Sequence, residues 1–243
     1  VQTRFSRCYN RDTMTATLID GRAIADVVMT GLAGQLSALG EPLHLSAVCV
    51  GDDAGLRAFV KLKQKAAISI GAEFSSYFFD ANDEDGARQT LQYLAGDEAV
   101  HGIFVELPLP VSWNSAALLS LIPAQKDADI LSPSAQQAFY ENNSTVMPPP
   151  VLALQYVLNA HEIAVCGIRI AMIGAGELVG KPVAHWLTNQ GARVDIIDVT
   201  TPHPSEISQQ ADMVIAATGT PGLVTDEWIR EGATVIDYGY AKK

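Results

Sequence analysis

The segment from residue 168 to residue 190, IRIAMIGAGELVGKPVAHWLTNQ, constrains the fold of this chain more than any other. IRIAMI is a short apolar run with β-branched residues, which is typical of a buried parallel strand. Glycines follow at once, and apolar residues then recur at helical spacing until Gly191 ends the helix. Such a turn lets the backbone approach a pyrophosphate, which meets the first N–H groups and the dipole of the helix. The segment therefore predicts a dinucleotide-binding turn made by Gly174, Ala175, Gly176, Leu178 and Val179.

An alternative stays open at this turn, because the glycine spacing departs from the usual G-x-G-x-x-G fingerprint. The third glycine is Gly180, one place late, with Val179 before it. The same residues are compatible with a tight turn in an α/β protein that binds no nucleotide.

A second strand, RVDIID, runs from Arg193 to Asp198. Asp198 lies at the distance where a carboxylate usually meets the adenosine ribose 2′-hydroxyl. A carboxylate accepts hydrogen bonds from a free ribose diol and repels a 2′-phosphate, and Val199, Thr200 and Thr201 offer no cation. We therefore expect NAD or NADP as cofactor, with NAD favoured.

The remaining chain alternates predicted strands and helices, which indicates an α/β fold with parallel sheets and right-handed crossovers. Before residue 125 we expect strands at 44–51 and 73–79, a strand from Gly102 to Glu106 that runs out into prolines, and helices at 20–40, 54–70, 83–95 and 115–122, with Asp20 and Asn114 as N-caps. In the second half we expect a helix at 151–160, one from Ser205 to Ala211, one from Asp226 to Glu231, and strands at 213–219 and 234–239. Ligands of such sheets bind beyond the carboxyl ends of the strands.

Between Gln125 and Pro150 the periodic pattern lapses, and Met147-Pro148-Pro149-Pro150 must be extended. We interpret this segment as a linker. It divides the chain into an N-terminal parallel-sheet domain, residues 1–150, and a C-terminal Rossmann-like dinucleotide domain, residues 151–243. Residues 1–13 are polar, and we expect them to be poorly ordered.

The formal net charge of −11 argues against a nucleic-acid partner and against an anionic membrane surface. No apolar run approaches the length of a transmembrane helix. Cys8, Cys49 and Cys166 are far apart and odd in number, so we expect reduced core thiols in a cytoplasmic protein. The five histidines are scattered, and we predict no metal site.

Candidate catalytic residues lie in the first half. The predicted helix at 54–70 carries Lys61, Lys63 and Lys65, and residues two apart on a helix do not share a face. At most one or two of them can point at a cleft, and a solvated charged face is the plain alternative. Lys63 is one turn after Phe59, and Glu106 ends the strand GIFVE, so Glu106 is placed to ion-pair with Lys63.

Several stretches together resemble the bifunctional methylenetetrahydrofolate dehydrogenase/methenyltetrahydrofolate cyclohydrolase family. They are IDG at Ile19, the helix with Phe59 and Lys63, GIFVELPLP, PAQKDAD, IGAGELVGKP, ATGTPG and VIDYG, in the family's order and spacing. The resemblance also accounts for the late glycine, because the family's loop ends V-G-x-P. It implies a tetrahydrofolate site between the domains, a dinucleotide on the second domain and a homodimer.

The resemblance implies a role for individual residues. Lys63 would assist the opening of the methenyl cation by proton transfer and by steering water. Asp129 would hold the pterin through two N–H bonds from its amino-pyrimidine edge, beside Leu107 and Pro108. Thr218 and Gly219 in ATGTPG, and Tyr240 after VIDYG, would join the cofactor site.

This chain departs from the family at several positions. The family's tyrosine is Phe59, its QLPLP glutamine is Glu106, the glycine after KDxD is Ile130, and its loop serine is Gly176. The family's cysteine-threonine before a proline is Pro148-Pro149, and the family continues beyond Lys243, so we expect a divergent, C-terminally truncated member. A carboxylate beside Lys63 favours the charged ammonium, so we expect cyclohydrolase activity to be lost before dehydrogenase activity. The alternatives are a paralogue that binds nucleotide or folate without turnover, and an unrelated dehydrogenase.

Overall fold

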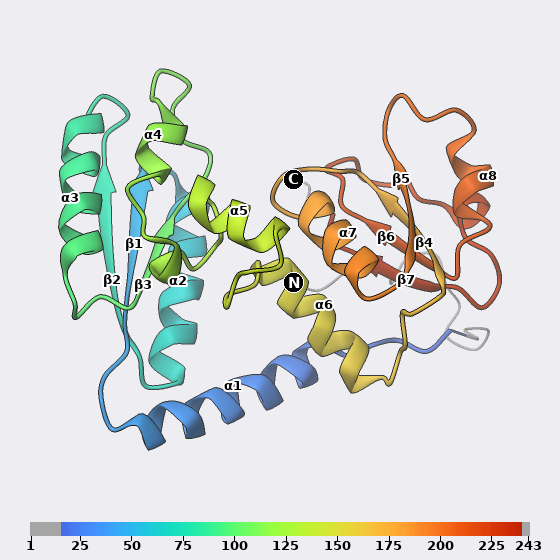
Figure 1. Ribbon diagram of the computed structural model, residues 1–243, viewed down its shortest axis with the longest axis horizontal. Coiled ribbons are helices and arrows are strands. Elements are labelled where there is room, and N and C mark those ends of the chain that lie inside the picture. Colours follow the sequence, from blue (N-terminus) through green and yellow to red (C-terminus); the bar gives the residue numbers. More distant parts are fainter. Residues whose placement is uncertain (1–15, 240–243) are drawn as a thin grey trace.

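The computed structural model describes residues 16–239, which form two parallel sheets with helices packed on both faces (Figure 1). The first sheet has the order β2 (Glu73–Phe79), β1 (His44–Val50), β3 (Gly102–Val105), and the second has the order β5 (Arg193–Ile197), β4 (Arg169–Ile173), β6 (Met213–Ala216), β7 (Thr234–Asp237). Every strand pair in these sheets is parallel, which confirms the α/β class that the alternating pattern predicted.

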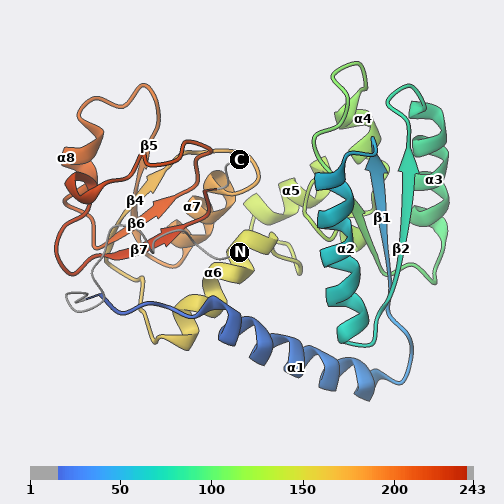
Figure 2. The same cartoon turned by 180° about the vertical axis from the view of Figure 1, so that it is seen from behind.

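The helices connect these strands in chain order. They are α1 (Gly21–Leu39), α2 (Ala54–Ser69), α3 (Glu84–Gly96), α4 (Ser115–Leu119), α5 (Pro133–Tyr140), α6 (Pro149–Ala160), α7 (Gly180–Asn189) and α8 (Pro204–Ser208), with short 3-10 segments η2 (Ala124–Lys126) and η3 (Asp226–Trp228). In both views α1 runs from beside the first sheet toward α6, and α6 lies between the two sheets (Figures 1 and 2). The predicted caps are confirmed, because Asp20 accepts from the N–H groups of Arg22 and Ala23, and Asn114 from that of Ala117.

Alternation along β1 divides the first core between two helix layers. Ala47 and Cys49 face α2, where they pack with Val60. Val48 points the other way and packs with Leu91 and its neighbours on α3. Successive side chains of a strand point to opposite faces, so one apolar run serves both layers. β3 lies beside β1 in the sheet, with Phe104 next to Ala47. Because α2 covers the face of Ala47 and Cys49, it also covers the side chains of β3 that point to this face.

The second sheet divides its core in the same way. Ile170 and Met172 of β4 face α6 and α7. Ala171 and Ile173 face the other side, where Trp228 of η3 packs against them. The strand IRIAMI is buried on both faces, as its continuous apolar sequence predicted.

The interpretation of residues 125–150 as a linker is wrong, because α5 forms within this segment. Ser132 caps α5 with its hydroxyl, and Pro133 occupies the first turn. Ala135 and Phe139 are buried in the same cluster as the α6 and α7 side of the second sheet. An eight-residue helix with two buried positions gives too little periodicity to be recognised in the sequence. The expected boundary near Pro150 stays a prediction.

The prolines before α6 were also misjudged. Pro149 and Pro150 are the first residues of α6 rather than part of an extended stretch, and Pro148 stands at the N-cap with an extended ψ. Proline suits the first turn of a helix because that turn has no use for its missing N–H. The run of prolines therefore starts the helix that crosses between the sheets.

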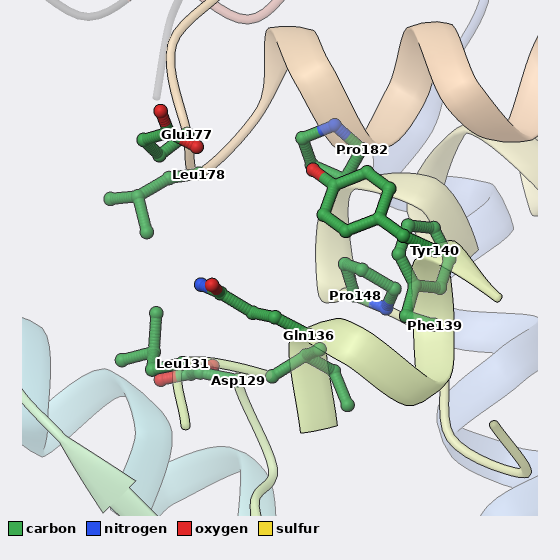
Figure 3. Close-up of a pocket in the computed structure, with 10 residues that line it drawn as sticks. Asp129, Leu131, Gln136, Phe139, Tyr140, Pro148, Glu177, Leu178 and Pro182 are labelled. Atoms are coloured by element: carbon green, nitrogen blue, oxygen red, sulfur yellow. The ribbon is translucent and has the colours of Figure 1, made fainter. Parts of the chain in front are cut away.

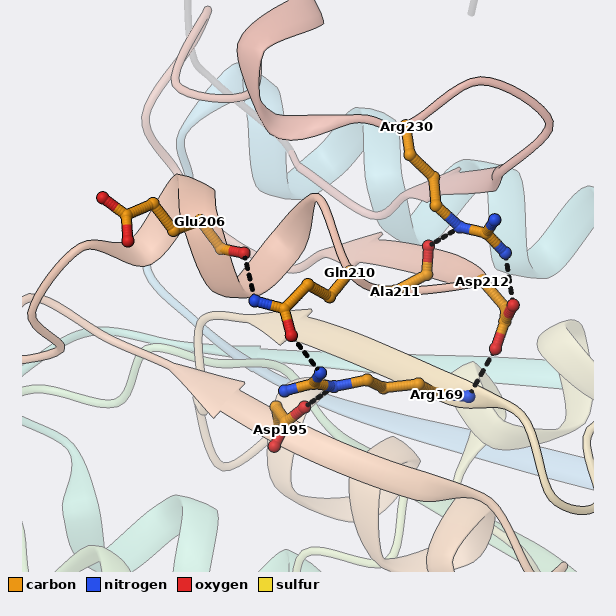
Figure 4. Close-up of polar contacts among 7 residues, drawn as sticks. All are labelled: Arg169, Asp195, Glu206, Gln210, Ala211, Asp212 and Arg230. Atoms are coloured by element: carbon orange, nitrogen blue, oxygen red, sulfur yellow. Dashed lines mark hydrogen bonds and ion pairs between the residues drawn. The ribbon is translucent and has the colours of Figure 1, made fainter.

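Two helices predicted in the second half are shorter than expected. The helix expected from Asp226 to Glu231 is only η3, and the one expected from Ser205 to Ala211 ends at Ser208. Two residues after η3, Arg230 donates to the Ala211 carbonyl at 2.8 Å and pairs with Asp212, and these contacts tie the segment before β7 to the start of β6 (Figure 4). Tertiary bonds thus replace the last helical turn.

The same polar cluster marks the amino-terminal edge of the second sheet, away from the glycine turn (Figure 4). The Arg169 guanidinium donates to Asp195 at 2.6 Å and to the side-chain amide oxygen of Gln210 at 2.5 Å, while the Arg169 backbone N–H donates to Asp212 at 2.7 Å. These exposed pairs align the strand starts and contribute little each to stability.

The cysteine prediction holds only in part. Cys49 is a buried free thiol, and burial raises its pKa to about 12. Cys166 is an exposed free thiol beside Gly191, so it is not the core residue that we expected. Cys8, residues 1–13 and Tyr240 lie outside the described residues. Within residues 16–239, no helix is both long and apolar enough to span a bilayer, and no three His, Cys, Asp or Glu side chains are grouped to hold a metal ion.

Candidate active site

The candidate site is built where α2 faces the carboxyl end of β3. Val60 and Ala67 are the buried residues of α2, and Lys63 lies between them on the same stripe, three residues after the first and four before the second. Lys63 therefore points at the sheet, whereas Lys61 and Lys65 are exposed. Of the three lysines considered in the sequence, only Lys63 belongs to the candidate site.

Two carboxylates hold the Lys63 ammonium. Its Nζ donates to Oε1 of Glu106 at 2.8 Å and to Oδ2 of Asp129 at 3.2 Å. Glu106 is 5% exposed and follows β3, where its N–H donates to the Val48 carbonyl at 2.9 Å. The predicted pair between Lys63 and Glu106 is present. The pair with Asp129 was missed, because nothing local links residues that are 66 positions apart.

Aromatic rings complete the surroundings of the ammonium. Lys63 Nζ lies 4.4 Å from the ring centroid of Phe104 and 5.0 Å from that of Phe59. Sequence reasoning singled out Phe59 but passed over Phe104, although alternation along the strand GIFVE places Phe104 on the same face as Glu106. The alternation of side chains along the strand was therefore the sequence signal that could have identified Phe104.

The loop that carries Asp129 is fixed by unusual backbone geometry. Asp127 bridges to Ile103 beside β3, and its carboxylate accepts from the Ser132 N–H at 2.6 Å. Ile130 has a φ of 55°, in the left-handed region that disfavours β-branched residues. This is the position where the family resemblance expects glycine. The buried Ile130 side chain packs in the core of the second sheet, which offsets the backbone strain.

Burial raises the pKa of the Asp129 carboxyl above its usual value, and the nearby Lys63 opposes that shift. Glu106 is followed by Leu107 and Pro108, which are exposed and joined by a cis peptide bond. Both follow Glu106 just beyond the carboxyl end of β3, and their part in binding a substrate stays a prediction.

The glycine turn has a steric basis. Gly174 has a φ of 92°, and a Cβ there would lie 2.7 Å from the Ala217 carbonyl oxygen. A Cβ on Gly180 would lie 2.1 Å from the Gly174 carbonyl oxygen, so α7 can start here only with glycine. At Gly176 a Cβ would meet nothing within 4 Å. The late third glycine thus performs the close helix–strand packing of the usual fingerprint.

The start of α7 leaves little backbone for an anion. Within the described residues, no side chain caps it, but the Lys181 N–H donates to the Gly176 carbonyl at 3.0 Å and Pro182 has no N–H, so of the first three residues only Gly180 offers an N–H. Thr218 and Gly219 follow β6, and the Thr218 methyl lies 2.9 Å from the Cβ position of Gly174. The structure therefore brings together Gly174, Ala175, Gly176, Leu178, Val179, Thr218 and Gly219 at the carboxyl ends of β4 and β6.

Asp198 stands one residue beyond β5, at the same edge of the sheet. Its Oδ1 accepts from the N–H of Thr200 at 2.8 Å and from the hydroxyls of Thr200 at 2.7 Å and Thr201 at 3.2 Å. The Thr200 bonds are the main reason that its pKa lies below the usual value. These bonds hold the carboxylate in one orientation, and among residues 16–239 no cation forms an ion pair with it.

One pocket joins the two halves of the candidate site (Figure 3). Asp129 and Gln136 line it from one side, and Glu177 and Leu178 of the glycine turn line it from the other. Tyr140 of α5 closes one end. The pocket is small, about 20 Å³, and it places the Asp129 carboxylate and the residues after Gly176 on opposite sides of one space.

Comparisons with known proteins agree on one family. The family model described as tetrahydrofolate dehydrogenase/cyclohydrolase, NAD(P)-binding domain, matches residues 148–243, and the catalytic-domain model of the same name matches residues 19–129. Bifunctional protein FolD of Staphylococcus carnosus is 34% identical over 231 residues, which cover 93% of this chain and 81% of that protein. FolD of Acholeplasma laidlawii is 30% identical over 223 residues, 91% of this chain and 80% of that protein.

Solved structures give the same result. The crystal structure of Trypanosoma brucei methylenetetrahydrofolate dehydrogenase-cyclohydrolase, complexed with NADP and an inhibitor, superposes with a TM-score of 0.88 at 34% identity, covering 93% of this chain and 80% of that one. A methylenetetrahydrofolate dehydrogenase from the silkworm, Bombyx mori, superposes with a TM-score of 0.85 at 28% identity, covering 91% and 82% of the two chains.

Proposed function

Because the chain belongs to the tetrahydrofolate dehydrogenase/cyclohydrolase family of NAD(P)-dependent enzymes, we propose that it oxidises methylene-tetrahydrofolate to methenyl-tetrahydrofolate. The observation that carries the proposal is the shared pocket, lined by Asp129 on one side and by Glu177 and Leu178 of the glycine turn on the other. When bound, the nicotinamide supplies the acceptor for a hydride from the methylene carbon that bridges two folate nitrogens. The residues of this chain would hold the methylene carbon and the nicotinamide in position for that transfer.

Asp129 is the proposed anchor of the substrate. Its carboxylate can accept two N–H bonds from the amino-pyrimidine edge of the pterin, a geometry that a carboxylate suits. Leu107 and Pro108 would border the ring. Hydride transfer depends mainly on holding the two reactants in line, so the dehydrogenase step does not require the lysine to change charge.

The second step is proposed to be weak or absent. Opening the methenyl cation requires a lysine that exchanges a proton and steers water. Lys63 lies between Glu106 and Asp129, and its ammonium is engaged in ion pairs with both carboxylates instead of being free to face a substrate. Phe59 offers the ammonium a ring face and no hydroxyl. Because Lys63 and Phe59 differ from an arrangement suited to proton exchange, a paralogue that binds nucleotide or folate without turnover is the alternative.

NAD is the proposed cofactor in preference to NADP. The ionised Asp198 stands where a free ribose diol would donate to it and where a 2′-phosphate would be repelled. Calorimetric titration with each nucleotide tests this. We expect NAD to bind more tightly and Asp198→Ala to narrow the difference, whereas equal or tighter binding of NADP would reject the preference.

The dehydrogenase proposal is tested by following NADH formation from methylene-tetrahydrofolate. We expect turnover in the native chain, a loss of at least about tenfold in kcat/KM in Asp129→Asn, and no change in Asp26→Asn, which removes an exposed carboxylate on α1. Nucleotide and folate binding without any turnover would favour the non-catalytic alternative. Turnover that ignores Asp129→Asn would overturn the assignment of the anchor.

The resemblance to the family further supports a homodimer, and the free thiols of Cys49 and Cys166 suit a reducing compartment such as the cytoplasm. Analytical ultracentrifugation tests the first of these. A purely monomeric protein at micromolar concentration would contradict it.

A further inference from the structure

We propose that Phe104 is a positioning residue for Lys63: the Phe104 ring holds the Lys63 ammonium against Glu106. The inference deepens the proposed function and rests on it for the role of Lys63. Its basis is the alternation of β3, which directs residues 104 and 106 to the face that α2 covers.

The ring is held from behind. Phe104 is half-buried and belongs with Cys49 and Val60 to the cluster under α2. Its centroid lies 6.2 Å from that of Phe74, in a tilted arrangement that fits aromatic pairs. These neighbours pack behind the ring, and its face is turned toward the ammonium of Lys63 on α2.

Lys63 of α2 lies above the Phe104 ring. The ammonium lies 4.4 Å from the ring centroid and 2.8 Å from the Glu106 oxygen. The attraction of a cation to a ring face strengthens as water is excluded, and the Lys63 side chain is only 20% exposed. The ring and the carboxylate, two residues apart on one strand, therefore hold the ammonium from two sides.

Phe59 is a weaker candidate for the same task. It lies on α2 itself, four residues before Lys63, at 5.0 Å from the ammonium, and it is 52% exposed. A ring in contact with water contributes less to holding a cation. Without Phe104 the ammonium would be free to move toward Asp129, the carboxylate at 3.2 Å, or into solvent.

The test measures the reactivity of Lys63 in the free protein, so that it does not depend on turnover. The protein is treated with acetic anhydride over a range of pH, and acetylation of Lys63, Lys61 and Lys65 is followed by mass spectrometry. Phe104→Leu and Phe104→Met remove the ring at two different volumes, and Phe104→Trp restores a ring. Phe78→Leu is the matched control, because Phe78 packs in the same cluster but holds Arg57, at 4.5 Å, instead of Lys63.

We expect both ringless variants to raise acetylation of Lys63 by roughly three- to tenfold, with Lys61 and Lys65 unchanged, and Phe104→Trp to return it to the native rate. Equal reactivity of Lys63 in the native, Phe104→Met and Phe78→Leu proteins would overturn the proposal, as would an equal rise in Phe104→Met and Phe78→Leu. If the acetylation pattern is as expected while no variant oxidises methylene-tetrahydrofolate, the positioning role stands and the proposed function fails.

Discussion

Replacing Glu106 by glutamine removes one negative charge from the Lys63 cluster and leaves its shape almost unchanged. The Glu106 side chain is 5% exposed, and its Oε1 lies 2.8 Å from the Lys63 Nζ. The glutamine amide oxygen can accept the same hydrogen bond. Asp129, at 3.2 Å, remains as the counter-ion. The substitution therefore isolates the effect of charge on the lysine from the effect of packing.

The structure sets the size of the expected effect. Two unit charges separated by 2.8 Å attract each other by roughly 6 kcal/mol at an effective dielectric constant of about 20. Most of this is retained or compensated, since the amide keeps a hydrogen bond, Asp129 stays charged and solvent reaches Lys63. A hydrogen bond to a charged group contributes about 1.5–3 kcal/mol. Replacing the Glu106 carboxylate by a neutral amide should therefore weaken its bond to the Lys63 ammonium by about 1.5 kcal/mol. A free-energy change of that size corresponds to about a tenfold change in rate.

The assay is the hydrolysis of methenyl-tetrahydrofolate, followed by the loss of its absorbance. We expect little activity in the native chain, about a tenfold rise in Glu106→Gln, and a further rise in Glu106→Gln with Phe59→Tyr, which supplies a hydroxyl near the amine. Glu98→Gln removes an exposed carboxylate elsewhere and should change nothing. Dehydrogenase activity, measured in parallel, should vary by less than about twofold, because positioning dominates that step.

Robust hydrolysis by the native chain, with no response to either substitution, would refute the reasoning. A rise in hydrolysis accompanied by an equal rise in dehydrogenase activity would also count against it, since that pattern would indicate a general change in substrate binding.

Three further predictions concern the turn, the buried carboxylate and α5. Gly180→Ala places a methyl group 2.1 Å from the Gly174 carbonyl oxygen, so we expect a loss of about 1–3 kcal/mol in unfolding free energy and weaker nucleotide binding, whereas Gly176→Ala, with nothing within 4 Å, should be neutral in both denaturation and calorimetry. The raised pKa of Asp129 means that the folded protein binds this proton more tightly than the unfolded chain, so ionisation of Asp129 lowers stability. As pH rises from about 4 through the raised pKa, the native protein should therefore lose unfolding free energy relative to Asp129→Asn, as measured by denaturant titration. A difference between the two proteins that stays constant with pH would contradict this. Phe139→Ala should cost about 3–5 kcal/mol in the same measurement, because Phe139 is buried in the core beside the second sheet, and a loss below about 1 kcal/mol would show that α5 is not part of that core.

The local elements were predictable because they depend on residues close together in the chain. Glycine geometry, apolar runs and capping side chains act over a few positions, so the strand, the turn and α7 were predicted close to their observed bounds. The cap at Asn114 was foreseen for the same reason. Predictions failed where packing overrides local preference. The clearest case is α5, which has only two buried residues, Ala135 and Phe139, and owes its place to a core formed by distant segments.

The candidate site divides along the same line. The residue types, the parallel α/β class and the glycine turn were evident before folding was considered, because periodicity and backbone sterics are local properties. Three features arise only from packing between distant segments: Lys63 faces inward, its ammonium is shared by Glu106 and Asp129, and the Phe104 ring lies against it. These contacts join residues 41 to 66 positions apart, and their distances depend on how α2 packs on the first sheet and how the loop after β3 crosses to the second.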